Sequence, residues 1–130
     1  MKTILLLGIF IMLSRPTVGE FLARDPTNLN QYRDGVIVNG ALVQRDYTCS
    51  DFAADLVRNA KAHGFEAESI VILFTHEIGH VIVAFYTDDG TIYVEPQTDT
   101  IYPLVEVGQP LCNIDWCVGN GEAVRKITTP

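Results

Sequence analysis

The residues best suited to chemistry are a cysteine at position 49 and a pentapeptide with two histidines that follows it in the chain. His76-Glu77-Ile78-Gly79-His80 fits the H-E-x-x-H pattern of zinc peptidases, in which both histidines bind the ion and the glutamate activates its water. That site requires a helix and a third protein ligand. In an extended segment the Cα atoms of His76 and His80 would be about 13 Å apart, too far for one zinc ion.

The residues after the pentapeptide favour a strand over a helix. Residues 81–83 read Val-Ile-Val, and β-branched runs are typical of strands. Downstream, the sequence predicts a hairpin rather than a second helix that would supply the third ligand. We therefore expect His80 to begin a strand and His76 and Glu77 to be solvated, with the zinc peptidase as an alternative.

A strand that begins at His80 brings a thiol mechanism into consideration. Residues 49–62 predict a helix, because Thr48 and Asp51 have the spacing of a capping box and apolar residues recur on one face. Cys49 lies in the first turn, where the helix dipole and free N–H groups favour an anionic sulfur. A nearby histidine would form a thiolate–imidazolium pair, and a third group would orient the ring.

Strand parity limits the choice of that orienting group. An Asp-Asp-Gly sequence predicts a hairpin, and either expected loop length places odd-numbered residues of the second strand on the face of His80. A tight loop places Asp99 directly opposite His80. A longer loop places Gln97 there, with Glu95 as a diagonal neighbour at roughly 7–8 Å. Spacing alone therefore leaves Glu95, Gln97 and Asp99 open.

The rest of the chain predicts one α+β domain behind an N-terminal leader. Hydrophobic residues make up 48% of the chain and charged residues 19%, which is ordinary for a globular protein. Short β-rich runs follow the helix, so we expect that helix to pack on an antiparallel sheet. Residues 1–19 combine a lysine, an apolar run and final small residues, which is typical of a signal peptide. Residues 20–130 would then form the domain.

Charge and cysteine content bear on location and partners. The net charge is −7, and removing two basic residues with the leader brings it to about −9. Such a charge disfavours nucleic acid and anionic lipid, and we expect no stable membrane insertion once the leader is removed. In an exported chain, Cys112 and Cys117 are expected to form a disulfide, which leaves Cys49 free. We therefore expect a secreted or otherwise extracytoplasmic protein.

The order of these segments resembles the transglutaminase-like group of papain-fold proteins. The resemblance covers residues 21–99 and rests on the stretches YTCSDFAADL, HGFEAESIVILF and GHVIVAFYTDDGTIYVEPQTD. In that pattern a cysteine opens a helix, a histidine opens a strand, and an acid followed by proline closes the next strand. The resemblance implies Cys49 as nucleophile, His80 as general base and acid, and Glu95 as the orienting carboxylate, where the family usually has aspartate.

The same resemblance implies a papain-like α+β fold and acyl transfer through a thioester on the cysteine, without a cofactor. The expected substrates are amides of peptides, proteins or the cell wall, cleaved by water or transferred to an amine. A non-catalytic binding module on the same fold is a further alternative, beside the zinc peptidase.

Overall fold

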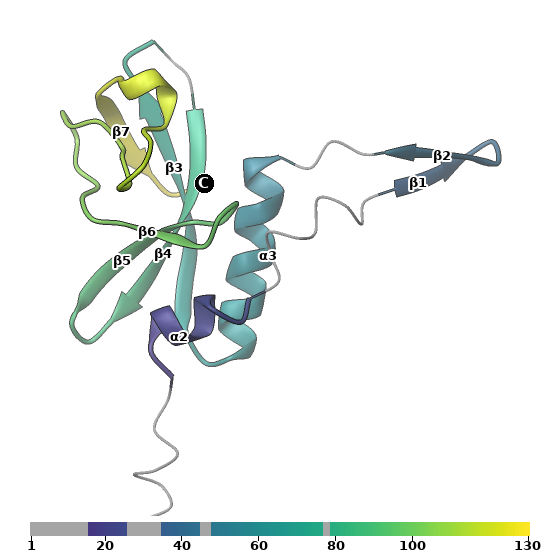
Figure 1. Ribbon diagram of the computed structural model, residues 1–130, viewed down its shortest axis with the longest axis horizontal. Coiled ribbons are helices and arrows are strands. Elements are labelled where there is room, and N and C mark those ends of the chain that lie inside the picture. The colour runs from purple at the N-terminus through teal and green to yellow at the C-terminus, as the bar shows by residue number, and fades with distance from the viewer. Residues whose placement is uncertain (1–15, 26–34, 45–47, 77–78) are drawn as a thin grey trace, which may run out of the picture.

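The chain has an α+β architecture in the computed structural model, which describes residues 16–25, 35–44, 48–76 and 79–130 (Figure 1). The helix α3 (Cys49–Ala62) packs on a five-stranded antiparallel sheet. The expected α+β class, with a cysteine-bearing helix on an antiparallel sheet, is therefore confirmed. In the described part of the chain, no helix combines the length and apolar character needed to cross a membrane.

The elements before and after α3 follow the chain in a simple order. Within the described residues a short helix, α2 (Val18–Leu22), comes first, and β1 (Gly35–Val38) and β2 (Ala41–Gln44) pair as a separate hairpin. The large sheet has the order β6-β5-β4-β3-β7. Its strands are β3 (Glu66–Phe74), β4 (Gly79–Thr87), β5 (Gly90–Glu95), β6 (Thr100–Tyr102) and β7 (Val124–Thr128).

The helix α3 has the bounds that the sequence predicts, because its signals are local. The backbone N–H of Thr48 donates to Asp51 Oδ2 at 2.9 Å, which is the reciprocal bond of a capping box. Gly64 adopts a left-handed φ of 87° just after the helix, a conformation that favours glycine over other residues.

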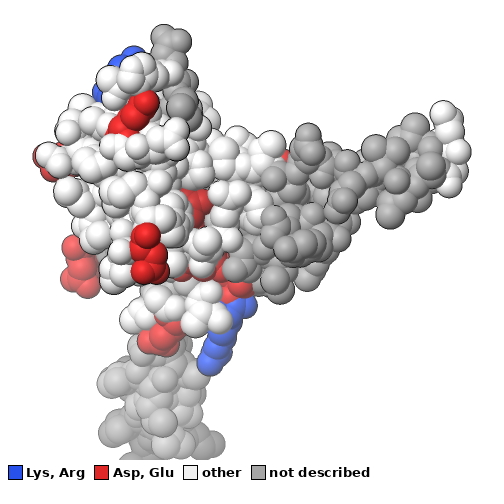
Figure 2. Space-filling model, turned by 45° about the horizontal axis from the view of Figure 1, so that its top comes forward, with Lys and Arg blue, Asp and Glu red and all other residues white. Residues whose placement is uncertain are grey.

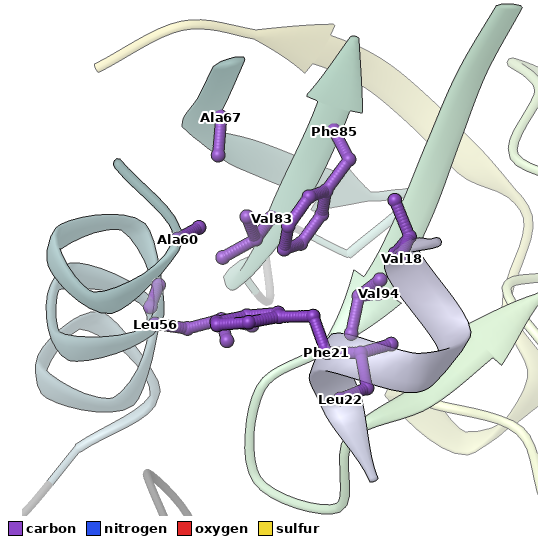
Figure 3. Close-up of a cluster of buried hydrophobic side chains, with 10 residues drawn as sticks. Val18, Phe21, Leu22, Leu56, Ala60, Ala67, Val83, Phe85 and Val94 are labelled. Carbon is purple, nitrogen blue, oxygen red and sulfur yellow. The ribbon is translucent and has the colours of Figure 1, made fainter. Parts of the chain in front are cut away.

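The apolar residues form two clusters, one on each face of the large sheet. The first lies between the sheet and the two helices, where the Phe21 ring of α2 reaches toward Leu56 of α3, as Figure 3 shows. It also includes Val83 and Phe85 of β4. The second cluster covers the opposite face, where Ile82 of β4 packs with residues of β3, β6, β7 and the segment that joins β6 to β7.

The helix α2 spans the boundary that the sequence predicts for signal-peptide cleavage, between residues 19 and 20. The Thr17 hydroxyl accepts a hydrogen bond from the Glu20 N–H at 3.1 Å and caps this helix. Val18 is 4% exposed and belongs to the first cluster. Cleavage after Gly19 would therefore remove a buried side chain from the fold, and that boundary stays a prediction.

Candidate active site

The register of the β4–β5 hairpin brings Glu95 close to His80. The strands pair from Thr87 with Gly90 up to Val83 with Val94. This register is the one expected for the longer loop, which places Gln97 level with His80 and Glu95 diagonal to it. Strand parity left Glu95, Gln97 and Asp99 as candidates for the orienting group. Of these three, Glu95 is the one whose side chain bonds to the imidazole of His80.

The two side chains form a short, buried contact. His80 Nε2 lies 2.6 Å from Glu95 Oε2, with 12% of the histidine side chain and 1% of the glutamate side chain exposed. The Tyr102 hydroxyl donates to the same carboxylate oxygen at 2.7 Å. The backbone N–H of Gln97 donates to Glu95 Oε1 at 3.4 Å. Both oxygens of the buried carboxylate therefore have donors, as a buried charge requires.

This arrangement selects one imidazole nitrogen for proton transfer. An ionised carboxylate only accepts, so Nε2 must carry the proton that bonds to Glu95. Nδ1 of His80 is then the nitrogen with the lone pair, and it has no hydrogen-bond partner among the described residues. The pair can therefore hold a neutral ring ready to accept a proton at Nδ1.

Tyr102 is the member of this group that sequence reasoning missed. It is 4% exposed, and burial, with the negative charge of Glu95 as a second cause, raises the pKa of its phenol far above the usual value. The phenol is therefore protonated and donates to the carboxylate. The available signal was the turn after Glu95, because a second hairpin there pairs Tyr93 with Tyr102.

The beginning of α3, at Cys49, and the beginning of β4, next to His80, lie at the same end of the domain (Figure 1). The chain descends through α3, returns along β3 and descends again along β4, so the first residues of α3 and β4 share one end. The lengths of the two elements agree with this placement. At ~1.5 Å per residue α3 is about 20 Å long, and at ~3.3 Å per residue His80 lies about 20 Å from Tyr86 at the far end of β4. Cys49 is half-buried and is the free cysteine of the chain.

The helix that carries Cys49 and the imidazole of His80 lie on opposite faces of the sheet. The helix α3 packs on the face that carries Val83 and Phe85. His80 pairs with Ile72, and both follow the alternation that places Ile82 on the opposite face. No hydrogen bond joins Cys49 to His80 within the described residues. A contact between them would form at the edge of β4 before Val83, where β5 no longer pairs with it.

The two histidines of the H-E-x-x-H sequence bind different carboxylates. His76 Nδ1 lies 2.6 Å from Glu122 Oε1, and the hydrogen bond from His76 lowers the pKa of Glu122. The His76 side chain is 78% exposed, as expected, whereas His80 is part of β4. Glu77 lies outside the described residues. Across the described ranges, no three His, Cys, Asp or Glu side chains are grouped to hold a metal ion.

Asp99 lies away from the imidazole, in the turn between β5 and β6. It faces Asp25, which also accepts a hydrogen bond from the Asn59 amide at 3.1 Å. Burial and the negative charge of Asp25 raise the pKa of Asp99 from 3.8 to about 7. Asp99 therefore holds its proton more tightly than an ordinary aspartate does, at the junction between the segment after α2 and the sheet.

The Asp99 carboxyl is expected to make stability depend on pH. Because its folded-state pKa is raised, the folded chain binds the proton more tightly than the unfolded chain does. This contribution is complete below about pH 4 and is lost as the pH rises through about 7. We expect the denaturation midpoint to fall between about pH 5 and pH 8 and Asp99→Asn to flatten that slope. Asp89→Asn, at an exposed loop position, is the control; equal slopes in both variants would contradict the assignment.

The expected disulfide is confirmed, and its loop lies close to the face of the sheet that carries Tyr102. Cys112 and Cys117 are bonded to each other. Within their loop, Trp116 is 39% exposed and meets the Tyr102 ring edge-to-face, with centroids 6.3 Å apart. A disulfide is typical of proteins in oxidising compartments and fits an extracytoplasmic location.

The surface and the comparisons add little to the identity of the site. Acidic side chains are spread over the face shown in Figure 2, and basic ones lie at its margins. This distribution agrees with the net charge of −7. No family model, curated protein or solved structure matches the chain.

Proposed function

We propose that the chain is a thiol-dependent enzyme of transglutaminase-like, papain-related fold that cleaves or transfers amide acyl groups. Cys49 is the nucleophile, His80 the general base and acid, and Glu95 the orienting carboxylate. The observation that carries the proposal is the buried 2.6 Å bond between His80 Nε2 and Glu95 Oε2. A bond of this kind prepares the ring for proton transfer at Nδ1.

The element order supports the same assignment. A helix opened by the free cysteine, a strand opened by histidine and a strand closed by the acid follow one another as α3, β4 and β5. The beginnings of α3 and β4 lie at the same end of the domain (Figure 1). The first-turn N–H groups of α3 point toward that end, and the Cys49 N–H is one donor for a developing oxyanion.

The proposed reaction needs a rearrangement that brings the sulfur to Nδ1 around the edge of β4. The imidazole then takes the Cys49 proton, and the sulfur attacks the amide carbonyl to give a tetrahedral oxyanion. Collapse breaks the C–N bond, and the departing amine takes the proton from the imidazolium. Water or a second amine, deprotonated at Nδ1, attacks the thioester and releases the sulfur, which recovers its proton.

The test is labelling of purified protein with an electrophilic thiol probe at neutral pH under non-reducing conditions, which preserve the disulfide. We expect one label on the wild-type chain and none on Cys49→Ser, because the other cysteines are bonded to each other. A model thioester or amide substrate then distinguishes turnover from simple alkylation. Failure of the wild-type protein to react with either would contradict an enzyme.

A non-catalytic binding module on the same fold is the second candidate. The observation that favours it is the placement of α3 and of His80 on different faces of the sheet, without a hydrogen bond between Cys49 and His80 among the described residues. In that case Cys49 reacts with the probe no faster in the wild type than in His80→Ala.

A further inference from the structure

We propose that Tyr102 is a positioning residue, which fixes the Glu95 carboxylate and through it the tautomer and orientation of the His80 ring. The role in catalysis rests on the proposed function, whereas the positioning of the ring does not. The contact that carries the inference is the hydrogen bond from the Tyr102 hydroxyl to Glu95 Oε2 at 2.7 Å. That oxygen is the one that also accepts from His80 Nε2.

The two donors define where the carboxylate oxygen lies. Glu95 Oε2 is 2.6 Å from His80 Nε2 and 2.7 Å from the Tyr102 oxygen, so moving it shortens or stretches one of two strong bonds. The third donor, the Gln97 N–H, approaches the other oxygen at a longer 3.4 Å. Tyr102 is therefore the strongest restraint on the carboxylate apart from the histidine itself.

The length of the glutamate side chain explains why a restraint is needed. Glutamate has one more rotatable bond than aspartate, so holding it in one rotamer costs more conformational entropy. Glu95 is also 1% exposed, so water is not available to stabilise other positions of its charge. A rigid aromatic donor offsets both costs, because the phenol reaches the carboxylate with few rotatable bonds of its own.

Tyr102 is itself held in place on three sides. Its backbone is part of β6 and pairs with Tyr93 of β5. Its ring belongs to the second apolar cluster and is 4% exposed. Trp116, in the loop closed by the disulfide, packs edge-to-face against it. The hydroxyl therefore points at the carboxylate because the surrounding fold leaves the ring little other room.

The test compares Tyr102→Phe with Tyr93→Phe. Tyr93 is the strand partner of Tyr102, and its hydroxyl has no hydrogen-bond partner among the described residues, so it is a matched control. The first readout is the ¹⁵N spectrum of the His80 ring, identified by its loss in His80→Ala, together with exchange of the Nε2 proton with water. The second is the pH profile of Cys49 alkylation.

We expect the wild type and Tyr93→Phe to show a neutral ring protonated at Nε2, with slow exchange of that proton. Tyr102→Phe should mix the tautomers, speed the exchange and lower the alkylation rate by about 3- to 10-fold, the equivalent of one hydrogen bond. Unchanged ¹⁵N shifts and exchange in Tyr102→Phe would overturn the positioning role. If the shifts change while wild-type Cys49 is inert, the positioning role stands and the proposed enzyme fails.

Discussion

Replacing His80 with alanine is expected to slow the reaction of Cys49 with a thiol probe by about 100-fold or more at neutral pH. A positioned general base typically contributes 10²–10⁴-fold, and His80 is the base assigned to this thiol. The rate of alkylation, followed by mass spectrometry on the intact chain, measures the effect. His76→Ala is the control, because His76 bonds to Glu122 and its side chain is exposed.

Glu95→Gln should weaken the reaction less than His80→Ala does. The amide can turn its oxygen toward the position of Oε2, where it still accepts from His80 Nε2 and from the Tyr102 hydroxyl. The amide nitrogen then faces the Gln97 N–H, which loses only the longest of the three bonds. Equal losses in the two variants would contradict this ranking, and stoichiometric zinc in the purified protein that is lost in both His76→Ala and His80→Ala would favour the zinc peptidase.

Replacing Phe85 with alanine is expected to reduce the free energy of unfolding by about 3–5 kcal/mol. The side chain is 0% exposed and lies in the first apolar cluster, between the sheet and the two helices. Its ring meets Phe65 edge-to-face at 5.8 Å and Phe21 at 6.1 Å. Removing it leaves a cavity and breaks the contact between β4 and α2, so the change affects burial and aromatic packing together.

Chemical denaturation of both proteins, with the free energy extrapolated to water, measures this loss. Ile114→Ala is the control, because Ile114 is 94% exposed and its truncation buries or uncovers little. We expect the control to change the free energy of unfolding by less than about 0.5 kcal/mol. A similar loss in both variants would mean that Phe85 is not part of a tightly packed core.

The helix and the hairpin at the site could be predicted from sequence because their signals lie within a few residues. Thr48 and Asp51 bond across one helical turn, and Gly64 ends the helix by its own backbone conformation. Asp88 and Asp89 form the loop of the β4–β5 hairpin. Once that hairpin is expected, the alternation of strand side chains brings His80 and Glu95 to one face.

Tyr102 was harder to find because a second turn had to be known first. In the β-rich run over residues 101–107, only the part before Pro103 belongs to β6, so this run reads less clearly than β4 or β5. Its pairing with Tyr93 depends on the turn over residues 96–99. A hydrogen bond between side chains seven residues apart has no sequence pattern of its own.

The amino-acid sequence by itself determined the helix α3, the β4–β5 hairpin and the periodicity that pairs the histidine with its acid, because all three follow from backbone preferences over short distances. Only the tertiary structure decided the face of the sheet on which α3 packs relative to His80. The packing face depends on how apolar side chains are buried in the two clusters. These clusters combine residues that are far apart in the chain, from Phe21 to Val124. The relation between Cys49 and the imidazole is therefore a property of the packed domain, not of either segment.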